Sequence, residues 1–191
     1  VQSVCNKVLE INALFPKFSI ICISEHWFQL TESITSVILD NYKLVSFFCR
    51  SSTTHGGVAI FVNSSYFKYF ASRDDILALT VENHVELSAI ESKVLNLLVV
   101  IYRPPKGDMN IFLSVMNVLF EKVCASSRAL VFTDDFSIDF LKPSSNLREF
   151  CDSFIFQFIP YCASTHTFRV LFRQLFNKPR RRLCVQLCHE V

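Results

Sequence analysis

Hydrophobic residues along the chain follow two spacings, one typical of helices and one typical of strands. Residues 4–15 have their apolar residues on one helical face, namely Val4, Val8, Ile11 and Phe15. This spacing predicts an amphipathic helix that ends before Pro16. Phe18–Ser24 is instead a short, almost wholly apolar run, the pattern of a strand covered on both faces. The same kind of pattern predicts further strands at residues 42–48, 58–62, 76–81, 85–92 and 95–102.

A different pattern follows Pro104 and Pro105, which cannot donate backbone hydrogen bonds and so end the series of strands. Asp108 is a suitable N-cap for a helix over residues 109–125, whose apolar side chains again fall on one face. Residues 129–132 predict another buried strand, and residues 147–156 a further helix. Helices alternating with strands in this order predict an α/β domain in which helices cover the sheets.

Composition supports a folded domain and excludes two other classes of protein. Of the 191 residues, 51% are hydrophobic and 19% are charged, which suits a buried core and does not suit a disordered chain. The longest near-apolar stretch, residues 94–101, is far shorter than the ~20 residues of a membrane-spanning helix. The three glycines are few for this length, so either most tight turns form without glycine or the sequence has drifted from one with more.

The start of the sequence and its cysteines bear on where the protein is found. The chain begins with Val1 and shows no signal-peptide pattern, so we expect a fragment of an intracellular protein, nuclear or cytoplasmic and not secreted. Most of the eight cysteines lie inside apolar segments, where a reduced Cys behaves as a small hydrophobic residue. Two groups near the C-terminus lack the paired spacing of structural zinc sites: Cys162 with His166, and Cys184 with Cys188 and His189.

The last part of the chain is basic. After Asp152 there are six Lys or Arg residues and one acid, so this segment carries a net charge of 6 − 1 = +5, and the rest carries 2 − 5 = −3. One interpretation of Lys178–Arg182 is a nuclear-localisation signal or a phosphate-binding patch. The interpretation that we favour is a solvated tail, because runs of like charge repel one another and rarely pack.

Polar residues stand at the ends of three predicted strands. Glu25 follows the first apolar strand, Tyr102 ends a second, and Asp135 comes shortly after a third. A single acid in such a place is more often a helix cap or a turn residue. Together, however, acids at the strand ends of a covered sheet face the crevice in which α/β proteins bind ligands, and oxygen ligands of this kind suit Mg²⁺.

Four segments carry a resemblance to a known family. They are Ile23–Trp27, Gly56–Val62, Ile101–Pro105 and Val131–Asp139. In order and spacing these segments resemble the endonuclease/exonuclease/phosphatase superfamily, and more narrowly the apurinic-type endonuclease domain of non-LTR retrotransposon reverse-transcriptase proteins. The resemblance covers residues 1–168. It implies a four-layer α/β/β/α sandwich that is incomplete at the C-terminus, followed by a basic tail of residues 169–191 that does not match the family.

The resemblance also implies a reaction and a site. The reaction is cleavage of a DNA phosphodiester that depends on Mg²⁺ (or Mn²⁺), without a membrane partner or a small-molecule cofactor. Glu25 matches the glutamate that holds the metal, Tyr102 matches the tyrosine that contacts the phosphate, and Asp135 matches an aspartate that orients the attacking water beside the metal. Thr167 is a weaker match to a threonine on the phosphate side.

Three departures from the family pattern predict little or no catalysis in this chain. The family's Gly-Asp-Phe-Asn motif reads Asp134-Asp135-Phe136-Ser137, so a second acid faces the phosphate and Ser137 replaces the asparagine that places the nucleophile. A serine hydroxyl is shorter than that amide and lacks its second polar group. The family's first catalytic asparagine would precede Val1, and its Ser-Asp-His motif is not found in the 191 residues.

Three functional hypotheses follow from the sequence. The first is an active Mg²⁺-dependent DNA endonuclease. The second, which the missing Ser-Asp-His favours, is a catalytically dead relic of that domain, which either has no remaining role or binds nucleic acid in a salt-sensitive way without nicking it. The third is a phosphoesterase of the same superfamily that acts on another substrate, such as a lipid or sugar phosphate.

Overall fold

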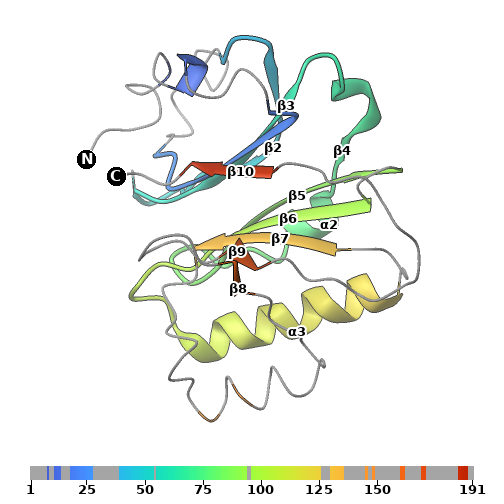
Figure 1. Ribbon diagram of the computed structural model, residues 1–191. Coiled ribbons are helices and arrows are strands. Elements are labelled where there is room, and N and C mark those ends of the chain that lie inside the picture. Colours follow the sequence, from blue (N-terminus) through green and yellow to red (C-terminus); the bar gives the residue numbers. More distant parts are fainter. Residues whose placement is uncertain are drawn as a thin grey trace.

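Two mixed four-stranded sheets lie face to face at the centre of the fold (Figure 1). This computed structural model describes residues 8, 11–13, 18–27, 39–53, 55–93, 96–125, 130–135, 145, 148, 160–161, 169–170 and 185–188. The first sheet has the order β10-β1-β3-β2, with strands β1 Ile20–Ser24, β2 Tyr42–Phe48, β3 Val58–Asn63 and β10 Val185–Cys188. The second has the order β4-β5-β6-β7, with strands β4 Ala71–Ser72, β5 Glu86–Ser92, β6 Asn96–Tyr102 and β7 Leu130–Asp135.

The remaining elements are short or lie outside the sheets. They are the 3-10 turn η2 Phe67–Tyr69, the helices α2 Asp74–Leu77 and α3 Met109–Ala125, and the antiparallel pair of β8 Pro160–Tyr161 and β9 Arg169–Val170. Within the two main sheets β1 pairs with β10, and β6 with β7, in parallel, whereas the other neighbours are antiparallel.

Apolar side chains form three separate layers, which confirms the predicted α/β/β/α sandwich. One layer lies between the sheets and includes Ile20, Ile60 and Val100. A second lies between the second sheet and α3, which covers that face in Figure 1. The third lies on the outer face of the first sheet, where Val8 and Ile11, both helical, contact the cluster around Phe61.

Helix α3 spans the predicted residues, Met109–Ala125. The carboxylate of Asp108 caps it by accepting hydrogen bonds from the backbone N–H groups of Asn110 at 2.7 Å and Ile111 at 3.2 Å. Its apolar face is buried against the second sheet through Phe112, Leu113, Met116, Leu119, Phe120 and Val123. The predicted capping residue and helical periodicity are both confirmed.

The strand predicted at residues 76–81 is wrong. This segment begins inside the short helix α2, whose first turn carries Asp74 and Asp75. The guanidinium of Arg73 binds Asp75 at 2.7 Å and Glu91 of β5 at 2.9 Å, which fixes the helix start, and Ile76 alone is buried beneath it. Acids favour the first turn of a helix, so local electrostatics here override an apolar run that is too short to decide the structure.

Part of the basic C-terminal segment forms a strand. Residues 185–188 make β10, which runs parallel to β1 with Val185 opposite Ile20. The edge of β1 offers unpaired backbone groups, and a short run with apolar residues at alternate positions can satisfy them. The solvated tail was predicted for Lys178–Arg182, which lie outside the described residues, as does most of the helix predicted at residues 147–156.

Candidate active site

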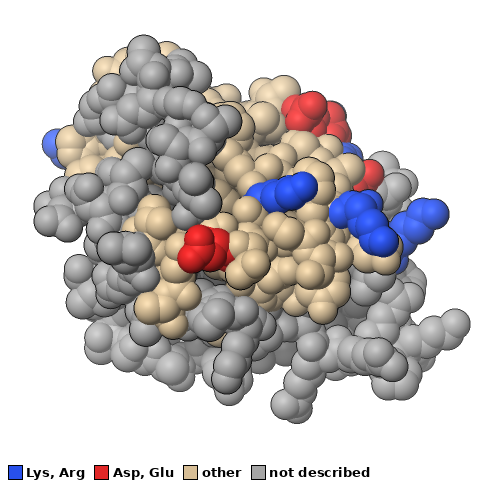
Figure 2. All heavy atoms as spheres, turned by 90° about the horizontal axis from the view of Figure 1, so that it is seen from above, with Lys and Arg blue, Asp and Glu red and all other residues tan. Residues whose placement is uncertain are grey.

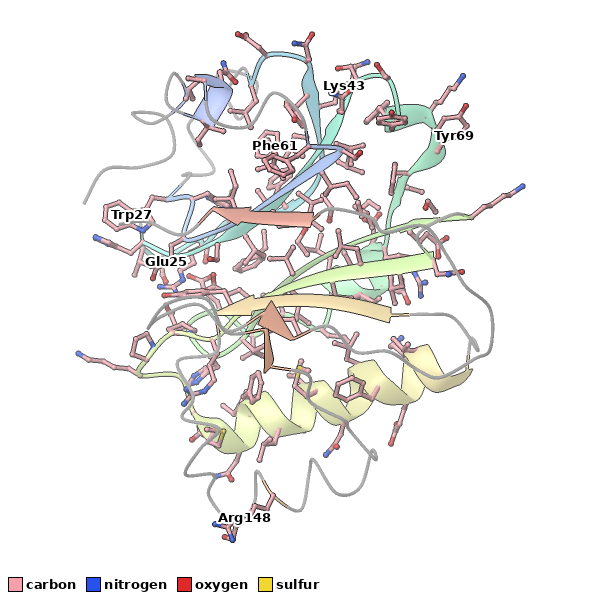
Figure 3. All side chains as sticks on the ribbon, viewed as in Figure 1. Glu25, Trp27, Lys43, Phe61, Tyr69 and Arg148 are labelled. Atoms are coloured by element: carbon pink, nitrogen blue, oxygen red, sulfur yellow. The ribbon has the colours of Figure 1, made fainter. Side chains whose placement is uncertain are left out.

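Three predicted site residues stand at neighbouring strand ends. Glu25 follows β1 directly, and the phenol of Tyr102, the last residue of β6, donates a hydrogen bond to the Glu25 carboxylate. Asp135 is the last residue of β7, and the register of the parallel pair places it opposite Tyr102. The structure thus brings all three to one end of the sandwich, as their positions in the sequence predict; Figure 3 labels Glu25 there, beside Trp27.

The phenol of Tyr102 is held in its neutral form. The residue is 3% exposed, and its burial, together with the hydrogen bond to Glu25, raises its pKa well above the ordinary value for tyrosine. A neutral phenol is a hydrogen-bond donor, and its proton is directed at the carboxylate of Glu25. The pair is therefore one negative charge with an oriented donor beside it.

The backbone that carries Glu25 has an uncommon conformation. Glu25 and Trp27 both have φ of 57°, in the left-handed region that residues with a side chain seldom adopt. Such residues each cost roughly 1–3 kcal/mol and persist only where the surroundings hold them. Here the N–H of Glu25 donates to the carbonyl of Gly57 at 2.8 Å, and that of Trp27 to the carbonyl of Gly56 at 3.0 Å.

The two glycines that accept these bonds cannot be replaced without strain. Gly56 and Gly57 have φ of 96° and 86°, where only glycine is at ease. A Cβ on Gly57 would lie 2.3 Å from the ring of His26 and 2.9 Å from the carbonyl oxygen of Phe48. His26 is itself buried, its Nε2 hydrogen-bonded at 2.8 Å to that same carbonyl, and burial lowers its pKa to about 4. The segment that presents Glu25 is therefore tightly packed around a neutral imidazole.

Two further charged residues at this end were not predicted from the sequence. Glu86, the first residue of β5, is 0% exposed and lies opposite Tyr102 in the antiparallel register of β5 and β6. One of its oxygens lies 2.5 Å from Nε of Arg50, and the other accepts the N–H of Gly57 at 2.6 Å. Burial raises the pKa of the Glu86 carboxyl, while the charge of Arg50 acts in the opposite direction. The available signal was an acid inside an apolar strand, which has to be paired when buried.

A second glutamate fixes the loop that bears Arg50 and the glycines. The carboxylate of Glu82 accepts hydrogen bonds from both the backbone N–H and the hydroxyl of Ser51, and from the same two groups of Ser52. These donors, first the Ser52 hydroxyl, lower the pKa of Glu82 to about 2. The segment between β2 and β3 is thus held at two points. It forms hydrogen bonds to Glu82, in the turn before β5, and to Glu86, the first residue of β5.

The residues present fit a divalent cation that needs few protein ligands. No group of three or more His, Cys, Asp and Glu side chains that could hold a metal occurs among the described residues. Mg²⁺ is usually bound through one or two carboxylates, with water and substrate phosphate completing its shell. Glu25 is one such carboxylate, hydrogen-bonded to Tyr102, and the register of β6 and β7 places the backbone of a second acid, Asp135, opposite Tyr102.

Three other predicted or discussed residues have no described side chain. Ser137 and Thr167 lie outside the described residues, and Asp134 is placed only by register, opposite Ile101. Most of the described surface on the face seen from above is uncharged, with both signs of charge present (Figure 2). In the part of the chain that the structure describes, no helix is long and apolar enough to cross a membrane.

Comparison with known proteins gives matches in structure. No protein-family model and no curated protein sequence matches the chain. The endonuclease domain of TRAS1, a telomere-specific non-LTR retrotransposon, is similar with a TM-score of 0.57 and 15% identity, over 90% of this chain and 78% of that one. The catalytic domain of Xenopus laevis APE2 is similar with a TM-score of 0.52 and 15% identity, over 88% of this chain and 77% of that one. The chain therefore has the fold of the endonuclease/exonuclease/phosphatase superfamily, as the resemblance of its motifs predicts.

Proposed function

We propose that this end of the sandwich binds a divalent cation together with a DNA phosphodiester, and that the chain retains this binding without appreciable hydrolysis. The observation that carries the proposal is the hydrogen bond from Tyr102 to Glu25, with Asp135 next to Tyr102 in register. An acid, an oriented donor and a second acid on adjacent strand ends are what phosphate and a hard cation require.

Each of the three residues has a role that its chemistry supports. Glu25 and Asp135 would hold Mg²⁺ (or Mn²⁺), which when bound stabilises negative charge on phosphate oxygens. Tyr102 keeps its single proton, which it donates to Glu25 and could donate to a phosphate oxygen instead when a phosphate is bound. A carboxylate at Asp135 can also orient a water molecule for attack, provided that other groups hold the water in line with phosphorus.

DNA is the substrate class that the comparisons favour. The TRAS1 structure is that of an endonuclease domain from a telomere-specific retrotransposon, and the four motifs of this chain resemble that class of domain. The likeness supports a nucleic-acid phosphodiester over a lipid or sugar phosphate. The phosphoesterase hypothesis stays as the alternative that small phosphoester substrates would test.

Substitutions in the motifs support binding without turnover. Ser137 stands where the family pattern has an asparagine, and Asp134 adds a charge that repels phosphate. Loss of a single donor to the transition state typically lowers kcat by about 10²–10³-fold. These two changes together predict hydrolysis below detection in ordinary assays.

The experiment combines binding and nicking of supercoiled plasmid DNA with the parent chain, Glu25→Ala and Asp135→Ala, each in Mg²⁺ and in EDTA. Glu121→Ala, on the exposed side of α3, is the matched control. We expect an Mg²⁺-dependent gel shift that both site variants lose and the control keeps, with no nicking.

Each other outcome would contradict one part of the proposal. Nicking that disappears in both site variants would show an active endonuclease. Binding that is equal in all four chains and independent of Mg²⁺ would show a nucleic-acid-binding relic without this site. Hydrolysis of small phosphoesters, without DNA binding, would favour the other substrate class.

A further inference from the structure

Glu86 is a buried acid at the candidate site for which the proposed metal and phosphate contacts give no role. Its side chain is 0% exposed, at the first residue of β5. Arg50, its partner, has a side chain that is 9% exposed. A buried ion pair often adds little net stability, because desolvation of both charges opposes their attraction. Stability alone is therefore a weak account of why an arginine and a glutamate are buried at this point.

Contacts from this ion pair reach Glu25 by a main-chain route. Glu86 accepts the N–H of Gly57 at 2.6 Å, and the carbonyl of the same glycine accepts the N–H of Glu25 at 2.8 Å. The preceding residue, Gly56, accepts the N–H of Trp27 at 3.0 Å. Both Glu25 and Trp27 have the left-handed φ of 57°, which must be held in place by neighbours. Glu86 thus fixes the backbone of the two glycines, whose carbonyls hold Glu25 and Trp27 in this conformation.

A second route runs through side chains. The guanidinium carbon of Arg50 lies 5.9 Å from the centroid of the Tyr102 ring, within reach of a cation–π contact. The hydroxyl of that ring donates to the carboxylate of Glu25. A Cβ on Gly56 would lie 2.4 Å from the guanidinium of Arg50, so glycine there leaves the space that the guanidinium fills. Arg50 thus fixes the ring whose hydroxyl orients Glu25.

We propose that the Arg50–Glu86 ion pair is a positioning device that sets the conformation of Glu25 through both its main chain and its carboxylate, and thereby the affinity of the site for a divalent cation. The part that concerns the cation rests on the proposed function. The part that concerns the conformation of Glu25 does not, because it follows from contacts within the chain. Arg50 and Glu86 are positioning residues, and neither needs to contact metal or DNA.

The double variant Arg50→Gln/Glu86→Gln tests this proposal without leaving one charge buried and unpaired. A control is Arg73→Gln/Glu91→Gln, which removes the ion pair of 2.9 Å at the opposite end of the same strand, together with the contact of Arg73 with Asp75. Two readouts are measured on folded protein. One is amide hydrogen exchange at Glu25 and Trp27 relative to Leu98 and Val100 inside β6, and the other is quenching of Trp27 emission by Mn²⁺. Trp27 is the chain's one tryptophan, two residues from Glu25.

The Arg50/Glu86 variant should exchange the amides of Glu25 and Trp27 at least about tenfold faster, with β6 unchanged, because local opening is governed by local contacts. Its Mn²⁺ affinity should fall by roughly 10–100-fold, as for other groups that orient metal ligands. The Arg73/Glu91 control should alter neither. If the double variant does not fold, Glu86→Gln, which keeps the shape and one acceptor for Gly57, should show the same selective loss in smaller measure.

Parent-like exchange at Glu25 and Trp27 in a folded variant would overturn the positioning role. Equal acceleration in both double variants would also overturn it, since that is the result expected of a merely structural ion pair. A parent chain whose emission does not respond to Mn²⁺ would refute the proposed metal site instead. The exchange measurement would then still decide whether the ion pair positions Glu25.

Discussion

The phenol of Tyr102 donates a hydrogen bond to the carboxylate of Glu25 across 77 positions of sequence and from one sheet to the other. Glu25 follows β1 in the first sheet, and Tyr102 ends β6 in the second. The bond therefore ties the two halves of the sandwich together at the end where the site lies. The two side chains form a unit, because the loss of either one would leave the other without that contact.

Replacement of Tyr102 by Phe tests the strength of this contact. The variant keeps the ring and loses the donor, so the free energy of unfolding should fall by about 2 kcal/mol, the range for a hydrogen bond to a charged group. Urea unfolding followed by circular dichroism measures the change. Tyr66→Phe is the control, because Tyr66 is 48% exposed and should change stability by less than about 0.5 kcal/mol. Equal effects in the two variants would mean that the Tyr102 hydroxyl contributes nothing specific.

Elements whose apolar residues follow a regular helical or strand pattern were predictable from the sequence. Helix α3 and strand β2 have the predicted bounds, because Asp108 caps the helix and local apolar patterns specify both elements. The segment at residues 76–81 was not predictable in this way, since its structure depends on Arg73 reaching Glu91 on another strand. Strand β10 depends likewise on an edge of β1 that is more than 160 residues away in sequence.

The residues at the candidate site also differ in whether the sequence could predict their location. The location of Glu25, Tyr102 and Asp135 at one end of the sandwich could be predicted because each ends or follows an apolar strand, and strand ends of a covered sheet meet. Glu86 and Arg50 could not, because their pairing depends on the packing of one sheet against the other. Ser88, which bonds Ser46 at 2.8 Å between the sheets, shows the same effect: its alternation with apolar neighbours suggests an exposed face, yet it is buried.

Gly57→Ala should destabilise the chain by roughly 3 kcal/mol, since a side chain at φ 86° is strained and its Cβ overlaps the His26 ring and the Phe48 carbonyl. Thermal or urea unfolding gives the value. A double-mutant cycle with His26→Ala separates the two causes, because removal of the ring should recover the part due to overlap and leave the part due to φ. Strictly additive effects would show that the His26 ring does not require glycine at this position.

Glu82→Gln should loosen the loop between β2 and β3. A neutral amide is a weaker acceptor than the carboxylate and offers only one oxygen to the four donors of Ser51 and Ser52. We expect faster amide exchange at Ser51 and Ser52, and earlier cleavage of this loop under limited proteolysis. Asp40→Asn, in the exposed turn before β2, is the control. Unchanged exchange at both serines would indicate that the loop is held at Glu86 alone.

His26 should make the protein less stable as the pH falls from about 6.5 to 4. Its folded-state pKa is about 4, against 6.5 for an exposed histidine, so between these values the unfolded chain binds a proton that the folded chain does not. Linkage then removes stability as the pH decreases through this window, by about 3 kcal/mol once both values are passed. Above pH 6.5 the imidazole is neutral in both states and contributes no pH dependence.

Urea unfolding of the parent chain and of His26→Gln at pH 7.5, 6.0, 5.0 and about 4 isolates this contribution, because the difference between the two curves cancels the other titrating groups. The parent should lose more stability than the variant, and the gap between them should shift by about 3 kcal/mol over the window. Parallel curves would contradict the prediction and would mean that the imidazole can take up a proton in the folded chain. Such a result would also weaken the case for a rigid segment around Glu25, since the ring packs against Gly57, whose carbonyl holds the Glu25 backbone.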